Sequence, residues 1–245
     1  MSNLAKPLLS IVTVTKDCVG SLDKTLMSVS AIKTGEIEYI IVDGASTDGT
    51  LELIKRYEKL VDKFISEPDS GIYSAMNKGL DLASGKYTLF INGDDELLSD
   101  GFQVIWPILL GGSASIVSAK TKVLNEKGDA SILVAKPWQL SFFNSIPHPS
   151  TFVLTTLLRK YRFREDLRIA SDYDLFLRLM LDGNYFIKVD ALVALHHRGG
   201  ASANSILSLD EVSRIRKERL GKLRLQLCNY CWYLYRMIKT FFGHL

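Results

Sequence analysis

Two adjacent carboxylates, Asp94 and Asp95, follow a short apolar run over residues 87–91. A β-prone apolar run of this length predicts a buried strand, so the two acids should lie at its carboxyl end. Adjacent acids repel each other and lose hydration there unless a cation or hydrogen-bond donors compensate. Carboxylate oxygens suit Mg²⁺ or Mn²⁺, ions that commonly carry nucleotide phosphates. We therefore predict a divalent metal site, although a polar turn would also use Asp at these positions.

Three further acids also come just after predicted strands. Apolar residues recur at helical spacing between the strands, so strands and helices alternate from residue 8 to residue 95. This alternation predicts a mainly parallel sheet, and ligands bind such sheets beyond the carboxyl ends of the strands. We expect the acids to share one site. They are Asp17, Asp43 and Asp69, after predicted strands over 8–15, 38–42 and 64–66.

The pattern changes after residue 98. We predict a helix over 102–110 that Pro107 interrupts, and a hairpin of two strands over 114–124 and 131–135. A helix begins at Ser171, and a last strand covers 185–195. The two parts together predict an α/β fold with helices on both faces of the sheet.

Composition bounds the class of protein. The chain has 245 residues, of which 47% are hydrophobic and 23% charged, which fits one large α/β domain or two small halves. The sequence contains neither the glycine-rich motif that binds dinucleotides nor the P-loop motif that binds phosphates. An acidic site would therefore bind phosphates through a metal ion. The three cysteines form no disulfide framework and the start lacks a signal-peptide layout, which predicts a cytoplasmic protein.

The last forty residues differ in charge from the rest. Residues 206–245 contain eight Lys or Arg and three acids, a net charge of +5, whereas the total is +3. Apolar residues recur there every three or four positions, but the longest uncharged run is too short to span a membrane. A basic amphipathic helix on an anionic inner leaflet is one expectation. Packing on the rest of the chain, or in a homodimer, is the other.

Several short motifs occur in a specific order and resemble the family 2 glycosyltransferases with the GT-A fold. The resemblance covers roughly residues 8–200 and is greatest to small bacterial members that build exopolysaccharide and lipopolysaccharide. It implies a Rossmann-like sheet with a nucleotide-sugar-binding half (1–98), an acceptor-binding half (99–205) and a helical tail (206–245). The motifs are SIVTVT at 10–15, IVDGASTDGT at 41–50, DSGIYSAMNKG at 69–79, NGDD at 92–95, SDYD at 171–174 and a late His-x-Gly-Gly.

The resemblance implies an inverting sugar transfer from a nucleotide-sugar donor, with Mg²⁺ or Mn²⁺ as cofactor. It implies Asp172 as the catalytic base and Asp94 and Asp95 as metal ligands. A UDP-sugar donor is favoured and GDP is the alternative; the acceptor is a polyprenyl-diphosphate-linked glycan at the inner face of the cytoplasmic membrane, and no nucleic acid is expected. We assign Thr15, Asp43, Asp69, Asn77, Lys78 and Asp94 to donor binding, and His197 to the metal or diphosphate.

Some residues admit other interpretations. Asp172 could cap its helix instead of acting as a base, and His148, between two prolines, could face the acceptor or pack structurally. The chain departs from the family pattern at Lys16, where an aromatic is common, and at Ser171, where an acid often stands. A catalytically inactive nucleotide-sugar-binding subunit and a nucleotidyltransferase are therefore the alternative functions.

Overall fold

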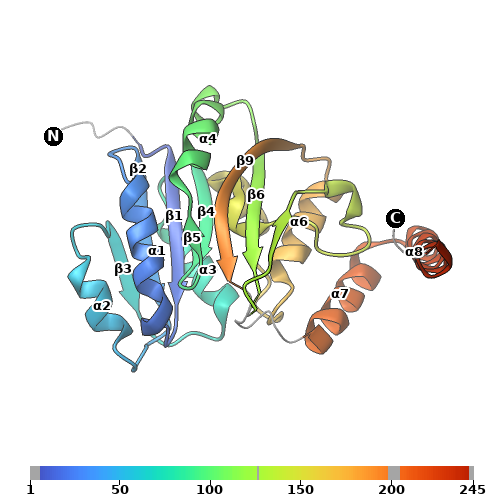
Figure 1. Cartoon of the computed structure of the whole chain (residues 1–245), viewed down its shortest axis with the longest axis horizontal. Coiled ribbons are helices and arrows are strands. Elements are labelled where there is room, and N and C mark those ends of the chain that lie inside the picture. Colours follow the sequence, from blue (N-terminus) through green and yellow to red (C-terminus); the bar gives the residue numbers. More distant parts are fainter. Residues whose placement is uncertain (1–5, 126, 198–204, 243–245) are drawn as a thin grey trace.

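The first part of the chain alternates strands and helices, as the sequence predicts. The computed structural model describes residues 6–125, 127–197 and 205–242 (Figure 1). The elements of this part are β1 (Leu9–Thr15), α1 (Val19–Ile32), β2 (Ile37–Asp43), α2 (Thr50–Arg56), β3 (Lys63–Ser66), α3 (Ile72–Leu82) and β4 (Tyr87–Asn92).

The second part contains both orientations of strand. Its elements are β5 (Glu96–Leu97), α4 (Ser99–Gly111), β6 (Ile116–Leu124), β7 (Ala130–Leu133), the 3₁₀ turns η1 (Pro137–Gln139) and η2 (His148–Ser150), β8 (Thr151–Leu154), α5 (Thr155–Tyr161), α6 (Ser171–Leu181) and β9 (Phe186–His197). Two helices follow, α7 (Ser205–Arg219) and α8 (Lys222–Phe242).

One sheet joins both parts in the order β3-β2-β1-β4-β8-β6-β9-β5, with β7 paired to β6. The strands β3, β2, β1 and β4 are mutually parallel, and their register sets Thr15 beside Asp43 and Val14 beside Asn92. The carboxyl ends of β1, β2 and β4 therefore meet at one edge. The short strand β5 returns antiparallel to β9, with Glu96 opposite Leu195, which brings the end of β9 to the residues that follow β4.

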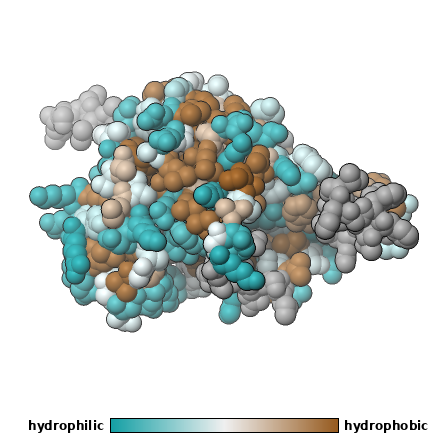
Figure 2. All heavy atoms as spheres, viewed as in Figure 1, coloured by the Kyte–Doolittle hydropathy of each residue, from teal (hydrophilic) through white to brown (hydrophobic). Residues whose placement is uncertain are grey.

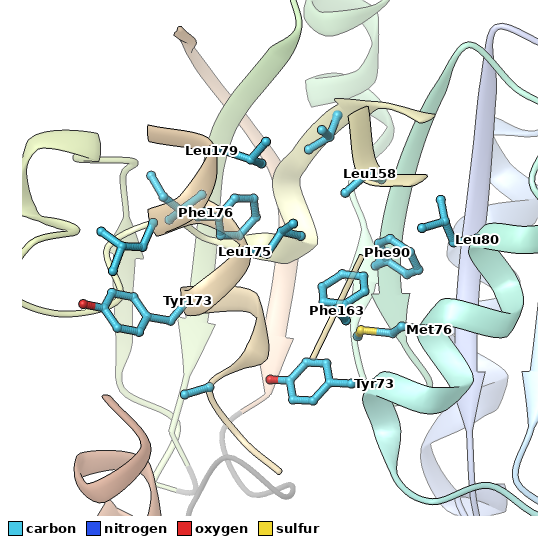
Figure 3. Close-up of a cluster of buried hydrophobic side chains, with 14 of the residues drawn as sticks. Tyr73, Met76, Leu80, Phe90, Leu158, Phe163, Tyr173, Leu175, Phe176 and Leu179 are labelled. Atoms are coloured by element: carbon cyan, nitrogen blue, oxygen red, sulfur yellow. The ribbon is translucent and has the colours of Figure 1, made fainter. Parts of the chain in front are cut away.

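Helices cover both faces of the sheet because the strand side chains alternate between two buried cores. On β1, Leu9 and Ile11 pack with apolar residues of α1, α2 and α4, whereas Val12 and Val14 pack with α3, α5 and α6. Figure 3 shows the second core, where Tyr73, Met76 and Leu80 of α3 approach Phe90 of β4 and the side chains of α6. The predicted α/β architecture is confirmed.

Three local predictions need adjustment. Helix α4 continues through Pro107 and does not end there. The helical spacing of Leu51, Ile54, Tyr57 and Val61 predicts a helix up to Val61, but α2 ends at Arg56. The tail forms two helices in place of one. Helix α7 packs on the domain through the buried side chain of Ile215, and Leu220, just after the helix, is buried in the same core. None of the helices in the described ranges is long and apolar enough to cross a membrane. In Figure 2, apolar residues gather at the centre of the viewed face among hydrophilic ones.

A buried carboxylate fixes the edge where α3 returns to the sheet. The side chain of Glu38 is 6% exposed; it pairs with Lys63 at 2.6 Å and accepts hydrogen bonds from Ser10 and from the amide and hydroxyl of Ser84. Burial alone would raise the pKa of Glu38, but the ion pair and the three donors outweigh it, so the pKa lies below its ordinary value of 4.5.

We expect Glu38→Gln to lower the free energy of unfolding by about 1.5–3 kcal/mol at pH 7, because charged hydrogen bonds of about this strength are lost. A carboxylate with a depressed pKa stabilises the fold above its unfolded pKa, and this contribution disappears as the pH falls through the folded pKa. In urea titrations the difference between the two proteins should be full above pH 4.5 and should shrink as the pH falls below that value. An equal difference at pH 7 and at pH 3.5 would contradict this account.

Candidate active site

A large cavity of about 1420 Å³ lies at the carboxyl edge of the sheet. Residues after β1 and β4 form part of its wall, and segments around η2, α6 and the end of β9 form another part. Of the residues singled out from the sequence, the structure places Thr15, Asp69, Asp94, His148 and Asp172 on this wall. The acids that follow separate strands and the start of α6 thus share one cleft.

Asp43 lies beneath the cavity and not on its surface. Its carboxylate is fully buried and accepts hydrogen bonds from the hydroxyls of Thr15, Ser46 and Ser66 and from the Ser46 amide. Burial acts to raise the pKa of Asp43, but these donors prevail and lower it. The predicted contact with a base stays a prediction, and it would require at least one of these donors to release the carboxylate.

Asp69 enters the cavity wall beside the turn that follows Asp43. A methyl group built on Gly44 would lie 2.5 Å from Asp69 Oδ2, so only glycine leaves room for the carboxylate there. Asp69 Oδ1 accepts the amide of Gly71 at 2.9 Å, which closes the turn before α3. Asp69 therefore offers a carboxylate oxygen to the part of the cavity that β1 and β2 border.

The metal prediction rests on Asp94 and Asp95, which differ in their surroundings. Asp94 lines the cavity, and burial together with the Asp95 carboxylate raises its pKa, against the opposite influence of His196 and His148. Asp95 is fully buried; its Oδ1 lies 2.6 Å from His196 Nδ1, and its Oδ2 has no hydrogen-bond partner among the residues that the structure describes. One half of a buried carboxylate is thus left uncompensated at the cavity edge.

The residues fit a divalent cation in part. Among the described residues, no group of three or more His, Cys, Asp or Glu side chains could alone hold a metal. The uncompensated Asp95 Oδ2 and the likewise unpartnered oxygen of Asn92 are nevertheless hard oxygen donors beside Asp94. Mg²⁺ and Mn²⁺ commonly take only one or two carboxylates from the protein and complete their shell with phosphate and water. This donor set suits such a site.

The histidine beside these acids is His196 and not the predicted His197. Neighbouring residues of β9 point to opposite sides, so only one of the pair can face the cavity. His196 lines the cavity and contacts Asp95, whereas His197 Nε2 lies 3.0 Å from Glu96 Oε1 and does not line it. The predicted role of His197 stays a prediction, while His196 is the histidine that the structure places against Asp95; the rest of the motif, residues 198–200, lies outside the described residues.

Asn77 and Lys78, which we predicted to bind the nucleotide-sugar donor, form hydrogen bonds and an ion pair with other protein groups in the structure. The amide of Asn77 bridges to the backbone of Phe163 and to Glu165, and its side chain is buried away from the cavity. Lys78 pairs with Glu67 and donates to the carbonyl of Pro68. Both residues join α3 to neighbouring segments, and their predicted part in donor binding stays a prediction.

Asp172 faces the cavity from the first turn of α6. Its Oδ2 accepts Asn144 Nδ2 at 2.8 Å, and its Oδ1 lies 3.3 Å from the Tyr73 hydroxyl. The N-cap residue of α6 is Ala170, but Asp172 Oδ1 also accepts the amide of Tyr173 in the first turn of the helix at 2.8 Å. A role at the helix end therefore stays open beside the predicted role as base. Neutral donors orient this carboxylate without neutralising it, as a general base requires.

His148 lies between Asp172 and the acidic pair. Its Nδ1 is 3.8 Å from Asp172 Oδ2, and its buried Nε2 has no hydrogen-bond partner. Burial lowers the pKa of His148 despite the opposing influence of Asp172, Asp95 and Asp94, so the imidazole is neutral. Asn144, Tyr73 and His196 escaped the sequence analysis because only the fold brings them to Asp172 and Asp95.

Comparisons with known proteins show the family of the chain. The model of "Glycosyl transferase family 2" matches residues 10–168, more than half of the chain. A PGL/p-HBAD biosynthesis glycosyltransferase of Mycobacterium tuberculosis is 37% identical over 97 residues, and TuaG of Bacillus subtilis, named for teichuronic acid biosynthesis, is 36% identical over 98. These alignments span 38% and 39% of each chain, so the chain covers well under half of either relative.

Solved structures share the fold. TarS 1-349 of S. aureus in complex with UDP-GlcNAc superimposes with a TM-score of 0.71 at 18% identity, over 84% of this chain and 64% of that one. The mannosyltransferase PcManGT of Pyrobaculum calidifontis, in complex with GDP-Man and Mn²⁺, gives 0.66 at 19%, over 89% and 66%. The described architecture is a GT-A-like fold, and the chain belongs to glycosyl transferase family 2.

Proposed function

We propose that the chain is an inverting glycosyltransferase that moves a sugar from a nucleoside-diphosphate donor to an acceptor hydroxyl. The observation that carries this proposal is the joint position of Asp94 and Asp172 on one cavity wall. The family match supports transfer as the activity. Two structural neighbours bind UDP-GlcNAc and GDP-Man, which supports a nucleotide sugar, with UDP favoured and GDP as the alternative.

The reaction we propose is a single displacement. The acceptor oxygen attacks the anomeric carbon, its proton passes to Asp172, and the bond from that carbon to the diphosphate oxygen breaks with its electron pair on the leaving group. Asn144 and Tyr73 orient the Asp172 carboxylate toward the acceptor. Mg²⁺ or Mn²⁺ at Asp94 and Asp95 would supply charge neutralisation for the departing diphosphate.

The acceptor side of the cavity favours an anionic amphiphile. Ile132, Leu133 and Val134 line it and are 50%, 47% and 39% exposed. Lys136 and Arg168 also line it, and neither side chain has an ion-pair partner in the part of the chain that the structure describes. An apolar wall beside two cations suits a phosphate or diphosphate on a hydrocarbon chain. This supports the polyprenyl-diphosphate-linked glycan as acceptor.

The outer face of α8 supports attachment to an anionic membrane. Leu225 and Cys228 pack on the body, whereas Leu223, Leu227 and Tyr230 on the opposite side are 72%, 56% and 62% exposed. The helix has 21 residues, no acid and four Lys or Arg. It lies at one end of the molecule in Figure 1. We propose that it rests on the inner leaflet of the bacterial cytoplasmic membrane, with a homodimer contact as the alternative.

We expect Asp172→Asn to reduce sugar transfer or donor hydrolysis by about 10²–10⁴-fold, because the amide keeps the shape but cannot take the proton. The donor dissociation constant, measured by calorimetry, should stay within about twofold of the wild-type value because no donor contact is removed. Asp182→Asn, an exposed acid at the opposite end of the same helix, serves as the control. Full turnover in Asp172→Asn would exclude this residue as the base, and donor binding without any transfer in the wild type would favour the inactive subunit.

We expect Mn²⁺ to raise the melting temperature of the wild-type protein in the presence of UDP, and Asp95→Asn to remove most of that rise. The physical reason is that the buried, half-compensated carboxylate gains a counter-charge only when the cation binds. Asp100→Asn, an exposed acid in the first turn of α4, should respond like the wild type. A rise of equal size in Asp95→Asn would refute the metal assignment.

We expect the wild-type protein to sediment with phosphatidylglycerol vesicles and much less with phosphatidylcholine vesicles, and to be released in part by 0.5 M NaCl. Replacing Leu223, Leu227 and Tyr230 together by Ser should weaken vesicle binding about tenfold or more because about three buried apolar side chains are lost. Leu209→Ser, an exposed leucine of α7, is the matched control. A dimer that the triple variant dissolves, with no vesicle binding in the wild type, would favour the alternative.

A further inference from the structure

A buried carboxylate on α7 holds the backbone just before the proposed base. Glu211 is 7% exposed, and its two oxygens accept the amides of Arg168, Ile169 and Ala170 at 2.7, 2.9 and 2.9 Å. The family model ends at residue 168, so Glu211 lies outside the matched segment. It is far in sequence from the residues it binds and comes from the helical tail.

Three amides on one carboxylate form a strong and directional contact. Charged hydrogen bonds are shorter and about twice as strong as neutral ones, and burial removes water as a competitor. The three amides directly precede α6, whose N-cap residue Ala170 offers no side chain to that helix end. A negative charge at this end also interacts favourably with the helix dipole. Glu211 does not cap α6, because the amides it accepts belong to the segment before the helix; it holds from α7 the backbone that leads into Asp172.

Glu211 is connected to Asp172 through Ile169 and Tyr73. Ile169 is held on both sides, because Glu211 accepts its amide and its carbonyl accepts the Tyr73 hydroxyl at 2.5 Å. The same hydroxyl lies 3.3 Å from Asp172 Oδ1. Asp172 follows two residues after Ala170. A shift of the 168–170 backbone would therefore move Asp172 relative to both Tyr73 and Asn144.

Further contacts attach α7 to the same segment. Arg219 Nε lies 2.9 Å from the fully buried Asp174, and the more exposed pairs Arg214–Asp166 and Glu218–Arg164 flank it. The exposed pairs contribute little individually, so Glu211 and the Arg219–Asp174 pair are the main contacts of α7 with this segment, and only Glu211 binds the backbone of residues 168–170. Ser208 and Val212 of α7 line the cavity, so this helix is also part of its wall.

We propose that Glu211 is a positioning residue: it fixes the 168–170 backbone so that Asp172 points at the acceptor hydroxyl. We call the contact of Glu211 with the amides of residues 168–170 the clamp. The effect of the clamp on catalysis rests on the proposed function, whereas the contact itself is independent of that proposal. The donor side of the cavity is built from residues after β1 and β4, which do not contact Glu211. Loss of Glu211 should accordingly affect turnover and leave donor binding intact, which a general structural role would not do.

The test compares Glu211→Gln and Glu211→Ala in the full chain with Asp210→Asn, an exposed neighbour with no part in the clamp. Turnover of the nucleotide sugar that stabilises the wild type most in a thermal-shift screen should fall about 10–100-fold in Glu211→Ala. Glu211→Gln, which keeps one acceptor oxygen, should fall less. Donor dissociation constants should stay within about twofold in all three variants, since their binding residues are untouched.

Hydrogen exchange supplies a readout that needs no activity. The amides of residues 168–170 should exchange at least tenfold faster in Glu211→Ala than in the wild type or in Asp210→Asn, while amides of β1 and β4 stay protected. If no nucleotide sugar is turned over by the wild type, the proposed function fails and exchange still tests the clamp. Unchanged exchange and unchanged turnover would overturn the inference, as would a parallel loss of donor binding and turnover in Glu211→Gln.

Discussion

Carboxylates gathered at one edge of a sheet need compensation, and the rest of this structure follows from how each acquires it. Asp43 is saturated by four donors from its own part of the chain. Asp95 is compensated on one oxygen by His196 and on the other by no protein group. Asp172 has only neutral donors around its oxygens, apart from a histidine that burial keeps neutral. Three environments at one edge thus give three chemical characters to the same side chain.

These differences assign the acids to different tasks. A saturated carboxylate such as Asp43 stabilises the turn between β2 and α2 and sets Thr15 in the cavity wall. A half-compensated one such as Asp95 has free lone pairs but cannot reach an acceptor, because it is fully buried. The Asp172 carboxylate is ordered and partly accessible, which leaves it able to take a proton. The proposed division between metal ligand and base therefore depends on burial and donors and not on residue type.

Periodicity alone predicted most of the first ninety-five residues, because alternating apolar runs and helical spacing are local properties of the chain. The register of parallel strands then brought Thr15, Asp43 and Asn92 to one edge, as the fold class required. The site was less predictable. Choosing between His196 and His197 needs the phase of β9 relative to the cavity, and recognising the structural roles of Asn77 and Lys78 needs the partners Glu165 and Glu67. Such pairings span up to about a hundred residues of sequence and leave no local pattern.

The division of the site between two parts of the chain also has a functional meaning. The segment that matches the family, residues 10–168, supplies the acids that we assign to the donor and the metal. Asp172 and α7 lie beyond it, and we place them on the side where the acceptor would enter; His196 also lies beyond it but contacts Asp95. A family that transfers sugars to different acceptors can keep the first part and vary the second, provided that the base stays in place. A clamp from α7 onto the backbone before Asp172 meets that condition, because it fixes the position of the base through main-chain amides that any residue supplies, while the side chains around it are free to change.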